Sequence, residues 1–225
     1  MDIRFLGHAA FQLTDGTSTV LIDPFLTGNP RAAVTADELD ATTILVSHGH
    51  GDHLGDTVDI ARRTGATVVA IVETAGEIGS NGVADVRDPN LGGTVRFDWG
   101  SVKLVPAWHT ATTPSGTAAT PAGLLVEFGG RTIYHLGDTC LFSDLQLVGR
   151  GRTIDVALVP IGGHYTMDRF DAVEAARLIG ATTVVPIHYD TFPPIVTDAQ
   201  AFKADVEAQT SSKVVVLAPG ETLSA

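Results

Sequence analysis

The sequence has a single cysteine, no long apolar run and fewer basic than acidic residues. Only one of its 225 residues, Cys140, is a cysteine, so no internal disulfide can form, which is usual in a reducing cytosol. No uninterrupted apolar stretch approaches the roughly 18 residues that a membrane-spanning helix needs. The first residues also lack a basic segment followed by an apolar core. We therefore expect a cytoplasmic protein without a signal peptide or a membrane association.

Basic residues are outnumbered by acidic residues, 14 to 26, which gives a formal net charge of −12. Binding of an extended nucleic acid requires a basic stripe, and none is visible along the chain, so we expect no nucleic-acid partner. With 44% hydrophobic and 18% charged residues, the composition excludes intrinsic disorder. The length predicts a single domain over residues 1–225.

Short β-rich segments alternate with helical patterns. Strands are predicted at Ile3–Leu6, Ala10–Leu13, Thr19–Ile22, Ile44–Ser47, Thr67–Ile71, Thr94–Phe97, Val102–Pro106, Gly123–Phe128, Arg131–His135, Asp155–Pro160, Thr182–Ile187 and Lys213–Leu217. Helices are predicted at Asp56–Arg63, at about Asp168–Leu178, and after a capping box of Thr197 and Gln200. Meanders followed by strand–helix alternation predict an α/β domain in which two mixed sheets pack together under helices.

The segment His48-Gly49-His50-Gly51-Asp52-His53 follows a predicted strand and precedes a predicted helix. Its four potential metal ligands can converge because the two glycines give the backbone freedom to turn and to approach other segments. A zinc site takes three or four protein donors and, if catalytic, keeps one position open. So dense a cluster therefore indicates two metals side by side, whereas the alternative is a solvated loop that happens to be rich in histidine.

Two metals require further donors from other strand ends. His109 follows the strand Val102–Pro106, Asp138 follows Arg131–His135, and His188 ends Thr182–Ile187. Each alone is compatible with an ordinary polar residue at a strand end or, for Asp138, with a helix N-cap. Their joint appearance supplies the donors that the cluster demands.

This sequence resembles the metallo-β-lactamase superfamily. The resemblance lies in the order of its motifs, which is H-x-H-x-D-H, then a later histidine, then Gly-Asp, then a strand-terminal histidine. The stretches Gly7–Phe11, Ile22–Pro30 and Pro160–Met167 resemble one branch of the superfamily, the uncharacterised metal-dependent hydrolases near the L-ascorbate-6-phosphate lactonase group. The resemblance implies an αββα sandwich with a dinuclear site at one edge. It implies one metal held by His48, His50 and His109, and another held by Asp52, His53 and His188, with Asp138 bridging.

The expected function is hydrolysis of a small-molecule ester, lactone or phosphoester by a hydroxide that two divalent metals activate, with Asp52 orienting the nucleophile. Zinc suits the donors first, and manganese, iron and nickel are alternatives. A phosphodiesterase or nuclease of the same superfamily is a second hypothesis, and a non-catalytic metal-binding protein is a third. Exposed apolar surface on so hydrophobic a chain is compatible with a homo-oligomer.

Three residues near the donors have open roles. The resemblance favours Asp23 as the hydrogen-bond acceptor of a ligand histidine, against a plain turn residue. His164 follows two glycines and could donate a proton to a leaving group, bind substrate, or only be hydrogen-bonded within its loop. His8 has the same status.

The remaining residues of interest have structural interpretations. We expect His135 to be a satisfied core histidine. We expect Trp108 to be a packing residue, with lining of the pocket as the alternative, and Cys140 to be a small buried thiol in preference to a ligand or nucleophile. The stretch Thr110–Pro121 has no periodicity and directly follows a candidate ligand, so it is either a lid over the site or a plain surface loop.

Overall fold

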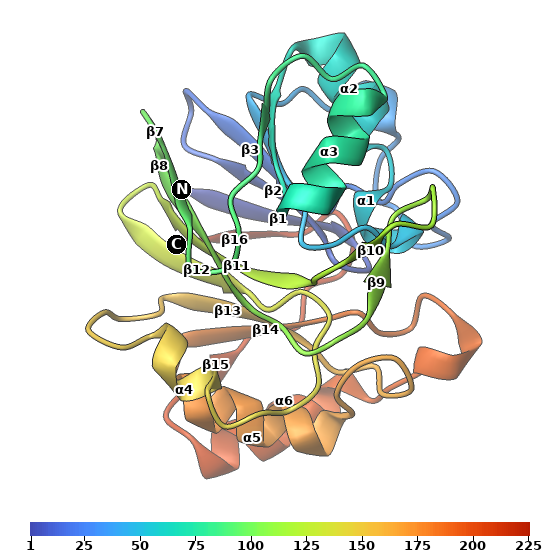
Figure 1. Ribbon diagram of the computed structural model, residues 1–225. Helices are drawn as coiled ribbons and strands as arrows, with labels where there is room; N and C mark the ends of the chain where they lie inside the picture. The colour runs from blue at the N-terminus through green and yellow to red at the C-terminus, as the bar shows by residue number, and fades with distance from the viewer.

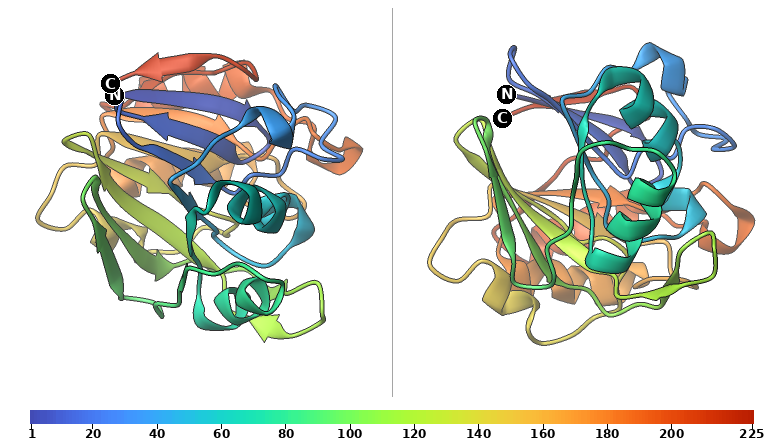
Figure 2. Two further views of the ribbon diagram at one scale, coloured as in Figure 1. Left: turned by 90° about the horizontal axis from the view of Figure 1, so that it is seen from above. Right: turned by 45° about the horizontal axis from the view of Figure 1, so that its top comes forward.

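The computed structural model describes residues 1–225 and consists of two seven-stranded mixed β-sheets packed face to face, with helices on their outer faces (Figure 1). The predicted αββα sandwich is confirmed. The two chain termini lie side by side, because the last strand pairs with the first (Figure 2). None of the helices has the length and apolar character needed to cross a bilayer.

The first sheet begins as an antiparallel meander and continues as a parallel sheet. Its strand order is β16 (Thr222–Ser224), β1 (Asp2–Gly7), β2 (Ala10–Thr14), β3 (Thr19–Ile22), β4 (Thr43–Leu45), β5 (Thr67–Val69) and β6 (Val86–Arg87). Strands β1 to β3 pair antiparallel, and β3 to β6 pair in parallel.

The second sheet is also mixed. Its strand order is β15 (Lys213–Val214), β14 (Thr183–Ile187), β13 (Val156–Pro160), β12 (Arg131–His135), β11 (Ala122–Phe128), β8 (Gly100–Pro106) and β7 (Thr94–Phe97). Strands β7, β8, β11 and β12 pair antiparallel, whereas β12 to β15 pair in parallel. The β7–β8 and β11–β12 pairs are both hairpins that the sequence predicts.

The helices divide between the two outer sides. Helices α1 (Gly51–Leu54), α2 (Thr57–Thr64) and α3 (Val72–Ser80) lie on the side of the first sheet, and α4 (Leu145–Val148), α5 (Arg169–Ile179) and α6 (Ala199–Gln209) on the side of the second (Figures 1 and 2). The 3-10 turns η1 (Ala36–Glu38) and η2 (Pro193–Ile195) lie in the connections. Helix α3 was not predicted, because its two glycines weaken the helical pattern.

Helix ends follow local chemistry, with one correction. Helix α2 ends at Gly65, which has the left-handed φ of 73° that glycine tolerates, and α5 begins after the capping carboxylate of Asp168. The predicted capping box of Thr197 and Gln200 is wrong. Asp198 immediately precedes α6, and its carboxylate accepts hydrogen bonds from the backbone N–H groups of the first turn.

The stretch Thr110–Pro121 is more ordered than the sequence indicated. It forms a two-stranded ribbon of β9 (Ala111–Thr112) and β10 (Ala118–Ala119). The turn of this ribbon is fastened to α3, because the Glu77 carboxylate accepts hydrogen bonds from Ser115 N (3.0 Å) and Ser115 Oγ (2.6 Å). The ribbon therefore bridges the loop after β8 to the helix layer of the first sheet.

The core between the sheets is apolar, and its strand directions place polar loops at one edge. Alternate strand positions such as Phe11, Leu104 and Leu124 are fully buried there, each contributing about 1.5–3 kcal/mol of burial free energy. Strands β1, β3 and β4 run in one direction within the first sheet, and β8, β12, β13 and β14 share a direction within the second. The segments that follow these seven strands meet at a single edge of the sandwich.

Candidate metal centre

The turn His48–His53 leads from the carboxyl end of β4 into α1. His50 immediately precedes α1, and Asp52 and His53 lie in its single turn. Gly49 is required by close packing, since a Cβ atom there would lie 3.1 Å from the backbone oxygen of Thr112 in β9. A Cβ atom at Gly51 would meet nothing within 4 Å, so only the first of the two glycines is explained by close approach.

Other strand ends bring further donors to this turn. His109 follows β8, Asp138 follows β12, and His188 follows β14. The structure brings all seven residues predicted as ligands together, and it adds His8, which follows β1. The seven are His48, His50, Asp52, His53, His109, Asp138 and His188.

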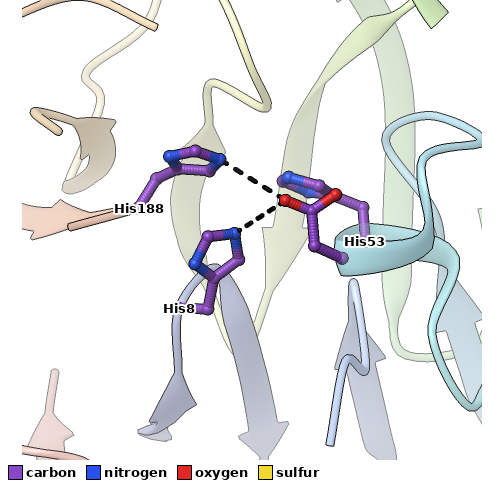
Figure 3. A group of neighbouring side chains, drawn as sticks. His8, His53 and His188 are labelled. Atoms are coloured by element: carbon purple, nitrogen blue, oxygen red, sulfur yellow. Dashed lines mark hydrogen bonds and ion pairs between the residues drawn. The ribbon is translucent and has the colours of Figure 1, made fainter. Parts of the chain in front are cut away.

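The donors form two groups with one carboxylate between them. One group is His48, His50 and His109, and the other is Asp52, His53 and His188, with His8 beside it. In the first group, His48 Nε2 lies 3.0 Å from His50 Nδ1. In the second, His188 Nε2 lies 3.8 Å from Asp52 Oδ2. His8 and His188 both point toward that carboxylate oxygen, with His53 nearby on its helix (Figure 3).

Asp138 is the carboxylate that lies between the groups. Its Oδ1 is 3.1 Å from His53 Nε2, and its Oδ2 is 3.1 Å from His188 Nε2. The same Oδ2 is 3.6 Å from His109 Nε2 and 3.9 Å from His48 Nε2. A single side chain is thus within a few ångströms of donors from both groups.

Unsatisfied polar atoms indicate that this arrangement fits a metal. His53 Nε2, Asp138 Oδ1 and both ring nitrogens of His188 are buried, and none of them makes a hydrogen bond of acceptable geometry despite the 3.1 Å contacts with Asp138. Each such atom costs about 1–3 kcal/mol when nothing satisfies it. Imidazole nitrogens and carboxylate oxygens are ligands of divalent transition metals, and a cation would satisfy several of these atoms at once.

The electrostatics lead to the same conclusion. Burial opposes a charge on His53, but the carboxylates of Asp138 and Asp23 outweigh it and raise the pKa of His53 well above its usual value. Burial also opposes the charge of Asp138, yet His188 and His53 hold its pKa well below the usual range. Burial and the neighbouring His53 hold the pKa of His48 well below its usual value. A proton on His53 therefore provides the positive charge that a cation would otherwise supply to these carboxylates.

Asp23 lies directly behind His53. It is fully buried, and its Oδ2 accepts a hydrogen bond from His53 Nδ1 at 2.7 Å. Its carboxylate is itself held by the Ser47 backbone N–H (2.7 Å) and hydroxyl (2.6 Å). Because Nδ1 is committed to Asp23, His53 can present only Nε2 to a cation.

His8 is connected to Asp52 on one side and to Thr191 on the other. Its Nε2 lies 3.2 Å from Asp52 Oδ2, and its Nδ1 lies 2.8 Å from Thr191 Oγ1. Burial lowers the pKa of His8 to about 4, against the opposing bond to Asp52, so the ring is neutral at neutral pH. Since the Asp52 carboxylate can only accept, Nε2 carries the hydrogen and the Thr191 hydroxyl donates to Nδ1. The sequence contains no signal that would have identified Thr191.

Backbone strain is concentrated at this edge. All five non-glycine residues with a left-handed φ, between 44° and 58°, follow the strands that converge here: His8, Asp23, His164, His188 and Asp190. Such residues persist only where the surrounding structure holds them, and they cluster at functional sites. The hydrogen bond from His188 N to His8 O, at 2.9 Å, joins two of them across the two sheets.

Other residues near the centre have different surroundings. His164 is exposed and belongs to neither donor group; its ring packs edge-on against Tyr165 at 4.5 Å. His135 is buried as predicted, bonding the Ala9 carbonyl through Nε2 and accepting from the Gly137 backbone N–H.

Two predictions about packing are wrong. Cys140 is exposed, because the chain has already left the sheet after β12 at this point. Trp108 is 66% exposed, since it lies beyond the end of β8, where no sheet or helix covers it.

A cavity of about 380 Å³ opens onto the donors. Its lining includes His50, Asp52, His109 and His188 from the two groups, and Asp138 between them. The aromatic side chains of Tyr165 and Phe192 complete its walls. Its volume suits a small molecule.

Known proteins are similar to this sequence over nearly its whole length. The chain is 46% identical over 228 residues to a UPF0173 metal-dependent hydrolase of Pelotomaculum thermopropionicum, covering 99% of both chains. Residues 18–189 also match the Beta-lactamase superfamily domain. The chain belongs to the UPF0173 metal-dependent hydrolases. A family member from Thermus thermophilus is 48% identical over 224 residues, covering 99% of this chain and 98% of its own.

The fold is likewise that of a known hydrolase. Igni18, a metallo hydrolase of Ignicoccus hospitalis, superimposes with a TM-score of 0.90 at 36% identity, covering 99% of this chain and 97% of its own. As a family member, this chain is a metal-dependent hydrolase of the metallo-β-lactamase fold. Residues 18–189 include every predicted ligand from His48 to His188, whereas His8 lies outside that stretch.

Proposed function

We propose that this hydrolase uses two divalent cations to cleave an ester, lactone or phosphoester bond in a small molecule. The observation that carries the proposal is the position of Asp138 between two groups of three donors. His48, His50 and His109 would hold one cation, and Asp52, His53 and His188 the other, with Asp138 shared. Zinc suits this nitrogen-rich set first, and manganese, iron or nickel remain alternatives.

Two bound cations would supply Lewis-acid polarisation of the scissile group and would lower the pKa of water in the site. The chain itself supplies orientation and charge. Burial opposes the charge of Asp52, but the His8 hydrogen bond and the charge of His53 lower its pKa, so it is a carboxylate at neutral pH. The Asp52 side chain is 29% exposed and faces the cavity, while that of Asp138 is 3% exposed. Asp52 is therefore the carboxylate that can accept a hydrogen bond from an attacking water.

A proton for the leaving group is the second requirement, and we assign it to His164. His164 follows β13 at the edge where the donors converge, and its ring contacts Tyr165, which lines the cavity. His164 itself does not line that cavity, so the assignment requires the ring to turn toward a bound substrate. Replacement of His164 by glutamine should lower kcat for substrates with poor leaving groups more than for nitrophenyl substrates.

The test combines metal analysis with a substrate panel. The purified protein is analysed for bound metals and assayed on chromogenic esters, lactones and phosphodiesters. We expect two equivalents of metal and turnover of at least one substrate. His50→Ala and Asp138→Ala should lose bound metal and turnover together, whereas Asp59→Asn, which alters an outward-facing carboxylate of α2, should lose neither.

The alternative functions predict different results on the same panel. Full metal occupancy without turnover of any substrate would favour a non-catalytic metal-binding protein. Turnover confined to phosphodiesters would favour the phosphodiesterase hypothesis. Turnover by Asp138→Ala with no bound metal would refute metal-dependent cleavage at this site.

A further inference from the structure

A groove leads away from the metal centre along β8, on the outer face of the second sheet. Its first part is a cavity of about 770 Å³ that shares His109 and Thr110 with the cavity over the donors. Its second part is a cavity of about 420 Å³ that shares Leu91, Pro106 and Phe142 with the first part. The three cavities therefore lie next to one another in a row, and the hydrolysis proposed above uses only the one over the donors.

The second part of the groove lies between β8 and the short helix α4. On β8, Val102 and Leu104 point into the core between the sheets, so Lys103 and Val105 point toward the helices. Helix α4 is the element nearest to this surface, but it has only four residues. It buries Leu145 and leaves Leu147 53% exposed, so an apolar surface stays open.

Trp108 stands where the groove joins the metal centre. The residue is 66% exposed, and its ring centroid lies 6.4 Å from that of Phe142, so the two tilted rings form one apolar surface. Its backbone is fixed, since its N–H donates to Thr139 Oγ1 at 3.0 Å and its carbonyl accepts from Cys140 N at 3.1 Å. An exposed tryptophan with a held backbone, next to the candidate ligand His109, provides a flat apolar surface for part of a ligand.

The far end of the groove is basic, although the protein carries a net charge of −12. Three of its 14 basic residues, Lys103, Arg150 and Arg152, line the second part. Arg152 is paired with Glu127 at 2.8 Å, but Lys103 and Arg150 take part in none of the ion pairs of the molecule. The only acidic residue that lines either part is Asp144.

We infer that this groove binds the non-reacting part of an elongated anionic substrate. An apolar chain or ring would lie over Trp108 and Phe142, and a terminal carboxylate or phosphate would lie at Lys103 and Arg150. Lys103 precedes His109 by six residues, so their backbones are at most roughly 20 Å apart, which limits the length of the substrate. This inference names the substrate class of the proposed hydrolysis. It rests on that proposal for the identity of the reacting bond, whereas binding of an anion in the groove does not depend on the proposal.

Trp108 fluorescence tests the inference by binding rather than turnover. The metal-loaded protein is titrated with dodecyl phosphate, dodecanedioate and neutral dodecanol. The anions should change the emission of Trp108, and the change should be absent in Trp108→Phe, where the half-buried Trp99 remains as the internal reference. The tighter of the two anions identifies phosphate or carboxylate as the preferred terminus.

Matched charge variants locate the anionic terminus. Lys103→Gln/Arg150→Gln should weaken anion binding by about three- to tenfold, the effect of losing two partly exposed ion pairs, and added salt should weaken it further. Lys213→Gln/Arg62→Gln removes one exposed lysine and one exposed arginine elsewhere on the surface and should leave anion binding within about twofold.

Four outcomes would overturn the inference. Three of them are the absence of a Trp108 signal, a loss of dodecanol binding in Lys103→Gln/Arg150→Gln as large as the loss of anion binding, and a loss of anion binding in Lys213→Gln/Arg62→Gln as large as in Lys103→Gln/Arg150→Gln. Sedimentation that shows a dimer whose formation alone shields Trp108 would also overturn it, because a second copy would then cover the groove. A substrate panel without turnover would refute the proposed hydrolysis while leaving a positive binding result intact.

Discussion

Replacing His8 by asparagine tests how the second group of donors is held. His8 has a φ of 58°, a conformation that asparagine adopts more readily than most residues, so the backbone link from His188 N to residue 8 O should survive. The shorter side chain removes the contact with Asp52 and leaves the Thr191 hydroxyl without its partner.

The expected loss follows from the contact that disappears. A hydrogen bond to a charged carboxylate contributes about 1.5–3 kcal/mol. At about 1.4 kcal/mol for each factor of ten, the second cation should bind about ten- to hundredfold more weakly, which is the usual effect of removing a group that orients a ligand. His48, His50 and His109 make no contact with His8, so the affinity for the first cation should be unchanged.

Cobalt titration measures both affinities. The protein is stripped of metal, and Co²⁺ is added in competition with a chromophoric chelator while the visible absorption of the bound ion is followed. Thr191→Val should weaken only the second site, and by less than His8→Asn, because His8 keeps its ring but loses the bond that fixes its tautomer. His164→Asn, a change at another histidine with left-handed φ but outside both donor groups, is the matched control for metal affinity. Wild-type affinity at both sites in His8→Asn would show that Asp52 is positioned without His8.

Three further predictions concern the support of the centre. Asp23→Asn should weaken binding at the His53 site about ten- to hundredfold in the same cobalt titration, and an unchanged affinity would contradict the role of Asp23 in orienting His53. Gly162→Ala should lower the free energy of unfolding in urea by about 1–3 kcal/mol, because its Cβ would lie 2.2 Å from the His188 carbonyl oxygen. The control Gly76→Ala in α3, where a Cβ would meet nothing within 4 Å, should raise that free energy by about 0.5–1 kcal/mol. Equal shifts in the two variants would count against the packing explanation. The pKa of His8 is about 4 in the folded state against 6.5 in the unfolded state, so between these pH values the unfolded state binds more protons. The contribution of His8 to the free energy of unfolding is therefore complete above pH 6.5 and should fall by about 3 kcal/mol by pH 4. Metal-free urea unfolding from pH 7 to pH 4 should therefore show a smaller loss for His8→Asn than for the wild type, and identical losses would rule out His8 as the source.

Strand patterns and turn residues were sufficient for most of the fold. The two hairpins of the second sheet and the meander of the first follow from alternating side chains bounded by glycines, which are local features. Helix α3 was missed because its sequence Val72–Ser80 has little helical preference of its own, and packing of Ala75 and Ile78 against the first sheet stabilises it instead. The exposure of Cys140 and Trp108 was also missed, because exposure depends on which other segments cover a loop.

The sequence by itself determined the donor types at the centre and their order along the chain. Those are properties of individual side chains: imidazole and carboxylate groups at strand ends can be identified without knowledge of the fold. Only the tertiary structure decided which donors lie together, because that depends on distances between strands far apart in the chain. It placed Asp138 between the two groups, Thr191 behind His8 at a separation of 183 residues, and the open groove beside α4. Each of these follows from how the two sheets pack and where the helix layer ends, which no local pattern records.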